Sequence, residues 1–255
     1  MVTDIKIEVE AVYTIWLREF KRYFRAKERI IGSMAMPLFW FLIFGMGLGS
    51  SISFTGVDVN YFSFLVPGII SMSILFTSLF SGVSVIWDRE FGFLKEMLVA
   101  PISRISIVIG KALGGATTAL IQSFLILAIA VIFGWSLSVS FLLLFIPLVL
   151  IISIGFVSLG LTIASLMQSI EGFQLIMNFI VMPMFFLSGA LFPLNSLPEW
   201  LRFVTYIDPL MYGVEILRFI SIGFSSFNPL ISLAVVILFS SAMSLLGAYT
   251  FSKQD

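Results

Sequence analysis

Charged side chains gather at one place in the middle of this chain, between Trp87 and Lys111, in a segment that reads WDREFGFLKEMLVAPISRISIVIGK. The charges alternate in sign along the segment: Asp88, Arg89, Glu90, Lys95, Glu96, Arg104 and Lys111. Alternating charges can fix the register of one protein surface against another without a large field of one sign. Long apolar runs flank the segment, and an ionised group costs about 3 kcal/mol at the centre of a bilayer. We therefore expect the segment to lie in water at a membrane face as a docking surface, with a merely solvated charged face as the alternative.

The chain offers little else for chemistry. It has no cysteine and no histidine, which excludes thiol chemistry, disulfides, histidine catalysis and the commonest zinc sites. The only Gly-Lys pair, at residues 110–111, lacks the flanking residues of a phosphate-binding loop, so any ATP must be bound by another chain. The acids Glu199, Asp208 and Glu215 lie in a later loop, where we expect them to be solvated. We predict no catalytic residue and no metal site, and an enzyme embedded in the membrane fits poorly.

The composition indicates an integral membrane protein. Of the 255 residues, 60% are hydrophobic and 11% are charged, and the mean hydropathy is +1.12. Soluble domains carry about 25% charged residues. The formal net charge is zero, so the distribution of the charges says more than their sum.

The elements that must position the charged segment are membrane spans. Six apolar stretches without charges are each close to the ~20 residues that cross a bilayer: 30–49, 62–86, 112–133, 140–167, 172–192 and 227–250. Six spans put both termini on one side, and that side carries twelve Lys and Arg residues against two on the other. The positive-inside rule therefore places both termini and the segment 87–111 in the cytoplasm. We expect the first apolar run to remain in the mature protein, because it is longer than a signal-peptide core.

The predicted spans contain no acidic or basic residue, which argues against the hypothesis of a proton-coupled carrier. A sodium-coupled carrier stays open as an alternative, because backbone carbonyl groups can coordinate sodium. Their most polar side chains are Gln122, Gln174 and Asn178, which we expect to bond neighbouring helices, although Asn178 could face a cavity. Glycines in the spans should allow close helix contacts. They are Gly45, Gly47, Gly49, Gly110, Gly114, Gly155 and Gly160.

Residues 1–29 precede the first span as a tail and an amphipathic helix. On a helical projection an aromatic face comprises Val9, Val12, Tyr13, Trp16, Phe20, Tyr23 and Phe24. The opposite face is basic and comprises Arg18, Lys21, Arg22, Arg25 and Arg29. We favour a helix in the lipid headgroup layer, with a helix packed on the protein's own core as the alternative.

The segment from 188 to 227 is apolar but broken by prolines, at 193–198 and at Asp208-Pro209. The pieces of about ten to fifteen residues are too short to span a bilayer. We expect short helices that enter the outer leaflet and return, with Trp200, Tyr206 and Tyr212 at headgroup level.

Two passages make the chain resemble the permeases of ABC type-2 exporters. The first follows the cytoplasmic loop of that family: Arg89-Glu90-x-Gly92-x-Leu94-Lys95-Glu96-x-Leu98-x-Ala100-Pro101-x-Ser103-Arg104, then Gly110-Lys111. The second follows its re-entrant segment: Phe186-Leu187-Ser188-Gly189, Phe192-Pro193, Leu197-Pro198-x-Trp200, Pro209-Leu210-x-Tyr212 and Leu217-Arg218. The resemblance covers nearly the whole chain. Asp208 departs from it, because many members have Asn before the proline.

The resemblance implies roles for two groups of residues in a six-span permease domain, 30–255. A coupling helix, about Glu90 to Val99, would seat in a separate ATP-binding-cassette ATPase through Arg89, Glu90, Gly92, Lys95, Glu96, Pro101 and Arg104. An outer gate would comprise Ser188, Gly189, Phe192, Pro193, Pro198, Trp200, Pro209 and Tyr212. Alanine at Glu90 or Arg104 should then weaken docking, and leucine at Gly189 should block the exit.

The resemblance also implies the partners and the direction of transport. Two permease copies would pair with two ATPase subunits, which would bind ATP and Mg²⁺, in the plasma membrane and without nucleic acid. Charge-free spans favour export of an amphipathic or hydrophobic compound, drug-like or lipid-like. Export of a lipid-linked polysaccharide or lipo-oligosaccharide is the alternative within the family.

Overall fold

The computed structural model describes residues 5–47 and 60–253, and every regular element within these ranges is a helix. The predicted all-α class is therefore confirmed. Residues 48 and 49 of the predicted first span, including Gly49, lie outside the described residues.

Five helices are long and apolar enough to cross a membrane. They are α3 with α4 (Tyr61–Ser81 and Val83–Glu90, one continuous span), α6 (Arg104–Ile132), α7 (Val139–Leu166), α8 (Ile170–Leu187) and α11 (Pro229–Ser252). A sixth span is present if the N-terminal pair, bent by 72°, is counted as one. The protein is thus a multi-pass membrane protein with five to six spans, in agreement with the six predicted.

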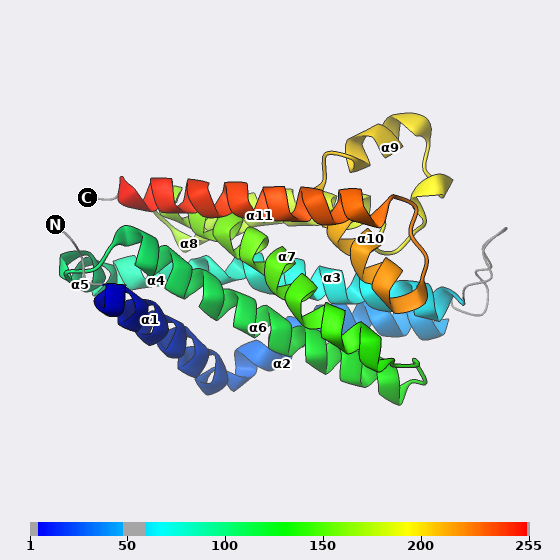
Figure 1. Cartoon of the computed structure of the whole chain (residues 1–255), viewed down its shortest axis with the longest axis horizontal. Coiled ribbons are helices and arrows are strands. Elements are labelled where there is room, and N and C mark those ends of the chain that lie inside the picture. Colours follow the sequence, from blue (N-terminus) through cyan, green and yellow to red (C-terminus); the bar gives the residue numbers. More distant parts are fainter. Residues whose placement is uncertain (1–4, 48–59, 254–255) are drawn as a thin grey trace.

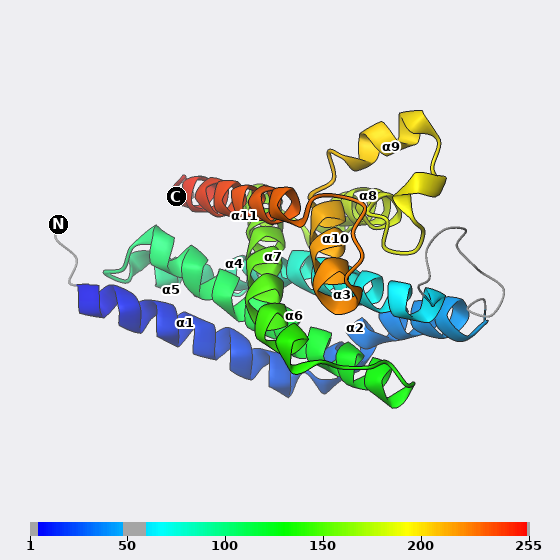
Figure 2. The ribbon, with the colours of Figure 1, turned by 45° about the vertical axis from the view of Figure 1, so that its right-hand side comes forward.

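The N-terminal pair forms an elbow along one side of the bundle. Helix α1 (Ile5–Arg25) lies along α6, and α2 (Lys27–Trp40) turns away from it and continues as a π-helix (Phe41–Gly47) beside α3 (Figure 2). Ala26 sits at the bend with non-helical backbone angles, φ −93° and ψ 66°.

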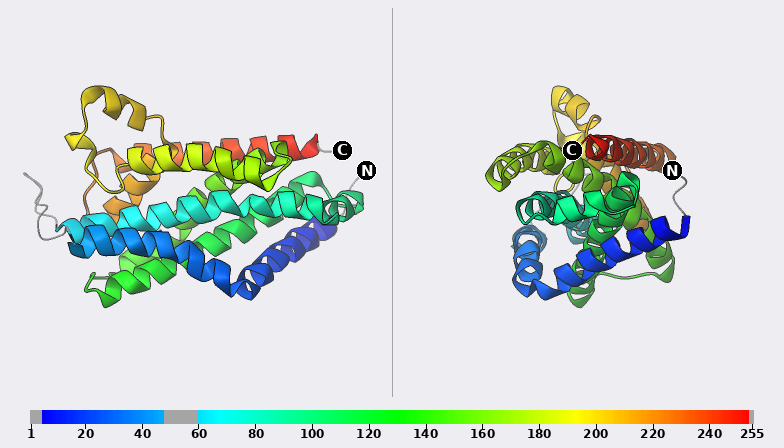
Figure 3. Two further views of the ribbon diagram at one scale, coloured as in Figure 1. Left: turned by 180° about the vertical axis from the view of Figure 1, so that it is seen from behind. Right: turned by 90° about the vertical axis from the view of Figure 1, so that its left-hand side faces the viewer.

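The bundle has two distinct ends (Figures 1 and 3). The start of α1, the short helix α5 (Phe93–Val99) and the end of α11 lie at one end, called here the α5 end. A 3-10 helix (Leu194–Ser196), α9 (Glu199–Thr205) and α10 (Pro209–Ile222) lie at the opposite end, called the α9 end. The first and last described helices therefore begin and end on the same side, as an even number of spans requires.

Glycines bring the long helices close together, as predicted. A Cβ atom at Gly160 would lie 2.4 Å from the carbonyl oxygen of Leu79, so α7 and α3 meet backbone to backbone. A Cβ atom at Gly114 would lie 2.6 Å from the Cβ of Glu19, so α1 lies directly on α6. The expected helix-bridging role of Gln122 is also confirmed, because its side-chain amide bonds the hydroxyls of Ser33 on α2 and Thr77 on α3.

The structure moves two predicted boundaries. The segment 87–111 is not a loop, because α4 runs on to Glu90 and α6 already begins at Arg104. The fifth span ends at Leu187 rather than at residue 192. Both helices around the charged segment continue because their charged residues find partners inside the protein.

Candidate functional site

The turn between α4 and α5 is built on Gly92. Its φ of +75° lies in the left-handed region that glycine adopts without strain, so the chain reverses within two residues. Helix α5 then buries Leu94 and Met97 and ends at Val99, two residues before Pro101. A helix thus lies inside the predicted range 90–99, and the remaining faces of α5 lie at the α5 end.

The exposed part of this turn forms one surface, called here the α5 surface. Its members are Glu90, Phe91, Lys95, Glu96, Val99 and Pro101. Phe91 and Val99 are 83% and 86% exposed, which is unusual for apolar residues beside a charged helix. Sequence reasoning named the charged members and missed these two, although an apolar residue directly before Gly92 was the available signal. Mixed charges around exposed apolar side chains are typical of a protein interface.

Besides Gly92 in the turn, two predicted coupling residues do not belong to the α5 surface. Arg89 donates hydrogen bonds to the carbonyl oxygens of Met167 at 2.6 Å and Ser165 at 3.1 Å, at the end of α7. Arg104 donates to the carbonyl oxygen of Leu98 at 3.1 Å and so satisfies the C-terminal end of α5. Both side chains hold the turn in place, because free carbonyl groups at helix ends attract nearby guanidinium groups.

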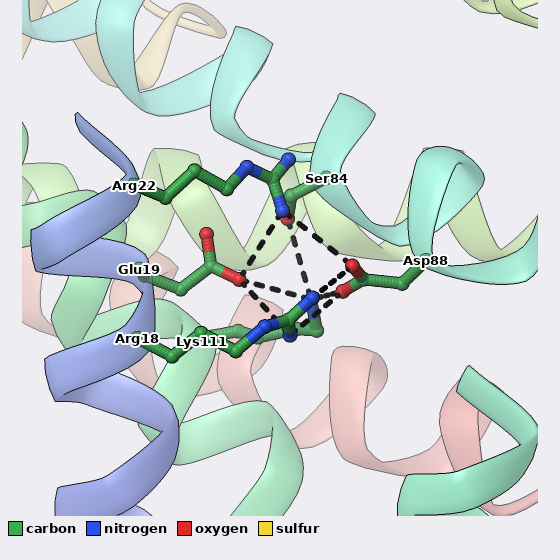
Figure 4. Close-up of polar contacts among 6 residues, drawn as sticks. All are labelled: Arg18, Glu19, Arg22, Ser84, Asp88 and Lys111. Carbon is green, nitrogen blue, oxygen red and sulfur yellow. Dashed lines mark hydrogen bonds and ion pairs between the residues drawn. The ribbon is translucent and has the colours of Figure 1, made fainter. Parts of the chain in front are cut away.

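Beneath the turn, five charged side chains from three helices form an ionic cluster (Figure 4). Asp88 on α4 pairs with Arg18 on α1 and with Lys111 on α6. Glu19 on α1 accepts from the Lys111 Nζ at 3.3 Å, and Arg22 lies 3.5 Å from the Asp88 carboxylate. The expectation that all charges of the segment lie in water is wrong for Asp88 and Lys111, which are 3% and 2% exposed. Mutual pairing compensates for the loss of water around these buried charges.

Helix α1 also contacts the start of α5 and the residue that caps α6. The Arg18 guanidinium lies 3.8 Å from the centre of the Phe93 ring at the start of α5. The Glu8 carboxylate accepts hydrogen bonds from the backbone N–H and hydroxyl of Ser103, at the start of α6. Neither contact was predicted from the sequence, because the partners are about 75 and 95 residues apart. These contacts join α1 to the start of α5 and to the start of α6.

The predicted basic face of α1 is split. Arg18 and Arg22 turn toward the ionic cluster, while Lys21 and Arg25 are exposed, and the side chain of Arg29 lies outside the described residues. The aromatic face forms a row of contacting rings along α1, from Tyr13 through Trp16 and Phe20 to Phe24. Helix α1 packs on α6, and Asp88 attracts Arg18 and Arg22 inward. For these two basic residues the structure matches the alternative prediction of a helix packed on the protein's own core.

At the α9 end, the first gate residues form a buried turn. Ser188 is fully buried and accepts a hydrogen bond from the N–H of Ala190 at 3.2 Å. Gly189 has a φ of +73°, and a Cβ atom there would lie 2.8 Å from Leu194. Leucine at Gly189 would therefore strain the turn whether or not a gate exists, so the predicted variant cannot separate gating from folding.

The other gate residues line the rim of the α9 end. Phe192 is 43% exposed and contacts the ring of Phe44, while Pro193 precedes the 3-10 helix. Pro198 and Trp200 begin α9, and Trp200 is 70% exposed. The gate function of these residues stays a prediction.

A fully buried ion pair fixes α10 in place. Glu215 and Arg218 lie 2.8 Å apart, and Arg218 also donates to the carbonyl oxygen of Gly189 at 2.9 Å. Glu215 accepts from the hydroxyl of Ser225 at 3.0 Å and from the N–H of Ser226. The expectation of a solvated Glu215 is wrong, because α10 folds back into the bundle and the pair ties together the two turns on either side of it.

Asp208 is the third acid that the structure buries against expectation, after Asp88 and Glu215, and it is 7% exposed. It caps α10, with Oδ1 accepting from the N–H of Leu210 at 2.8 Å, directly before Pro209 at the first helical position. Burial raises the pKa of the Asp208 carboxyl to about 7, against the opposing effect of that hydrogen bond. The Tyr212 hydroxyl nearby donates to the carbonyl oxygen of Tyr206 at 2.9 Å.

The acids do not gather into a metal centre anywhere in residues 5–47 and 60–253, where no three metal-ligating side chains come together. The structural features that stand out are the α5 surface with the ionic cluster below it and, at the opposite end, the short helices α9 and α10. Comparison with known proteins supports the same picture. The model of the ABC-2 type transporter family matches residues 10–222.

The chain belongs to the ABC-2 type transporter family. It is similar to transport permease ycf38 of Cyanophora paradoxa, with 30% identity over 96% of this chain and 89% of the relative. It is similar to Nodulation protein J of Rhizobium meliloti, with 30% identity over 82% of this chain and 80% of the relative. It is also similar to the inner membrane transport permease YadH of Escherichia coli, with 26% identity over 92% of each chain. The ABC-2 match spans α1 to α10 and so includes the α5 surface, the ionic cluster and the buried pair Glu215–Arg218.

Proposed function

We propose that this ABC-2 family member is the permease subunit of an ATP-driven exporter and that a separate ATPase docks on the α5 surface. The observation that carries the proposal is the α5 surface itself. Exposed charges of both signs accompany two exposed apolar residues, Phe91 in the turn and Val99 at the end of α5, at the same end of the bundle as the start of α1 and the end of α11. Aromatic and apolar anchors inside a polar rim are typical of binding surfaces.

The contacts below the α5 surface suit the transmission of movement. Closure of two ATPase subunits on ATP and Mg²⁺ would push α5, and α5 is joined to α1 through Phe93 and Arg18 and to α6 through Arg104. The ionic cluster in turn ties α1 and α6 to α4, the helix that precedes α5. Helices held by such contacts move as a unit, so a shift of α5 tilts the spans.

The transport path lies along α8 in this proposal, between two copies of the chain. Gln174 and Asn178 are exposed one turn apart on α8, beside Leu175 and Phe179, which are 61% and 77% exposed. Polar side chains that face lipid without a partner are unfavourable. A second copy in a two-fold arrangement would cover this face and leave the amides to line a shared path.

The compound exported is amphipathic or hydrophobic in this proposal, because the α8 face offers amide and apolar groups but only Glu171 as a charge. Lipid-linked glycan export is the second candidate. The exposed aromatic residues Trp200 and Phe203 on α9 favour it, because aromatic rings stack on sugars.

Docking can be tested by purifying the chain from native membranes in mild detergent and assaying the ATPase activity that comes with it. Phe91→Ala and Lys95→Glu should each reduce the co-purified ATPase at least tenfold, because both lie on the α5 surface. Glu199→Gln, an exposed acid at the α9 end, is the control and should retain it. Full retention in both α5 variants would remove the docking assignment.

The energy source separates the exporter from a sodium-coupled carrier. Transport in vesicles should require ATP on the α5 side and should persist after a sodium ionophore collapses the sodium gradient. Sodium-dependent transport by the chain alone would contradict the proposal.

The shared path can be tested by cross-linking, since the sequence contains no cysteine. Asn178→Cys should give a covalent dimer with a short bifunctional maleimide. Leu143→Cys, equally exposed to lipid on α7, is the control and should stay monomeric. The opposite pattern would place the second copy on another face.

A further inference from the structure

A cavity of 420 Å³ lies inside the elbow of α1 and α2, with α3 and α6 as its opposite wall. One end of it is polar and meets the ionic cluster at Arg22, Ser84 and Lys111. The other end is apolar and is lined by Met36, Phe76 and Phe80 among others. A cavity with these two ends matches a molecule with a charged head and a hydrocarbon tail.

The polar end has one positive charge in excess. The cluster contains three cations and two carboxylates, and the Asp88 carboxylate is already occupied by Arg18 and Lys111. Arg22 lies 3.5 Å from Asp88 and 3.7 Å from Glu19, in both cases through Nη1, and its guanidinium lies 5.2 Å from the centre of the Trp87 ring. Its Nη2 atom is buried and has no hydrogen-bond partner among the described residues. A buried guanidinium nitrogen without an acceptor favours an anion.

The apolar end is open enough for a chain. Gly32 lies on the cavity wall in α2, and a Cβ atom built there would have no heavy atom within 4 Å. The rings of Phe76 and Phe80 stack on the facing wall, 6.3 Å apart. The cavity lies toward the α5 end of the spans, where exposed Lys21 and Arg25 on α1 suit the headgroup layer.

We propose that this cavity binds one acidic phospholipid or a lipid-like phosphate ester of the same chemistry. Its phosphate bonds the Arg22 Nη2 atom, and one acyl chain lies between α2 and α3 against Phe76 and Phe80. A planar guanidinium matches a phosphate in geometry as well as in charge. The site lies inside a single chain, so it depends neither on the ATPase nor on which compound is exported.

The test is native mass spectrometry of the full purified chain with phosphatidylglycerol or phosphatidylcholine. The wild type should retain one phosphatidylglycerol in preference to phosphatidylcholine. Arg22→Gln should weaken that retention about tenfold, which corresponds to the loss of one charge-assisted hydrogen bond. Lys21→Gln removes the same charge from the neighbouring exposed position and should retain the lipid.

A second variant tests the cavity without changing any charge. Gly32→Leu fills the apolar end and should abolish retention, while helix α2 tolerates the side chain because nothing lies in its way. The proposal would be overturned if Arg22→Gln and Gly32→Leu retained as much phosphatidylglycerol as the wild type does. It would also be overturned if the wild type retained phosphatidylglycerol and phosphatidylcholine equally. Displacement of the lipid by millimolar inorganic phosphate would also overturn it, because the site would then take free phosphate.

Discussion

Single residues in this protein carry charge into places where the sequence suggests water or lipid. Asp88 forms ion pairs with both Arg18 and Lys111. The other carboxylate of α4, Glu90, is exposed. Removal of one partner from a buried ion pair leaves an uncompensated charge, which costs about 3 to 5 kcal/mol. The cluster is therefore sensitive to change at its centre.

Asp88→Asn should destabilise the protein by about 3 kcal/mol, because it removes one of the two carboxylates of the cluster and leaves three cations with Glu19 alone. The measurement is the midpoint of thermal unfolding in detergent. Glu90→Gln makes the same chemical change two residues along the chain at an exposed position and should leave the midpoint unchanged. Equal midpoints for both variants would mean that the cluster does not stabilise the fold.

Asp208 should make stability depend on pH. Its pKa is about 7 in the folded protein and near 3.8 when exposed, so the folded state binds the extra proton between these values. Stability therefore falls as the pH rises from about 4 to 7, by at least on the order of 1 kcal/mol. Asp208→Asn keeps a helix cap but carries no charge.

Unfolding midpoints at pH 5, 6, 7 and 8 test this expectation. The difference between Asp208→Asn and the wild type should grow with pH and reach its maximum at pH 8, with the variant more stable. Glu199→Gln, an exposed acid at the start of α9, is the matched control and should follow the wild type. A constant difference across the series would contradict a raised pKa at Asp208.

At the scale of elements, α1 acts as a brace and the long spans meet through glycine. Helix α1 contacts α5 through Arg18 and the start of α6 through Glu8, and it lies on the surface of α6 at Gly110 and Gly114. Where helices approach this closely, an added methyl group must push backbone atoms apart.

Gly160→Val should destabilise the protein by about 2 kcal/mol or more, because its Cβ would lie 2.4 Å from the carbonyl oxygen of Leu79. Gly32→Ala is the matched control, since it also changes a helical glycine but meets no atom within 4 Å. The control should keep or slightly raise the unfolding midpoint, because alanine favours helix over glycine. Similar losses in both variants would point to helix flexibility rather than to close packing.

At the scale of the whole molecule, the two ends of the bundle differ in chemistry. The α5 end carries α5, the ionic cluster, the start of α1 and the end of α11, and the α9 end carries the short helices α9 and α10 with exposed aromatic residues. The excess of Lys and Arg at the α5 end predicts that this end faces the cytoplasm.

Single cysteines introduced into this cysteine-free chain can test the orientation. In intact cells a membrane-impermeant maleimide should label Glu199→Cys on α9 and should not label Lys95→Cys on α5 until the membrane is permeabilised. Both positions are exposed, so accessibility alone does not distinguish them. Labelling of Lys95→Cys in intact cells would reverse the assigned orientation.

The sequence by itself determined what depends on composition and local pattern. Apolar length predicted the spans and the all-α class, and two motif passages led to the family that the comparisons show and, through that resemblance, to a short helix within 90–99. These inferences succeed because a bilayer imposes one length and one polarity on every span, whatever the neighbouring helices are.

Only the tertiary structure decided which charges are solvated. In the sequence Asp88 and Glu215 look like Glu90 and Glu199, yet the first two are buried and the last two exposed. The difference arises from partners that lie far away along the chain or in an adjacent turn, such as Arg18 for Asp88. Pairing across such distances leaves no periodic signal in the sequence, whereas it determines the free energy of a buried charge.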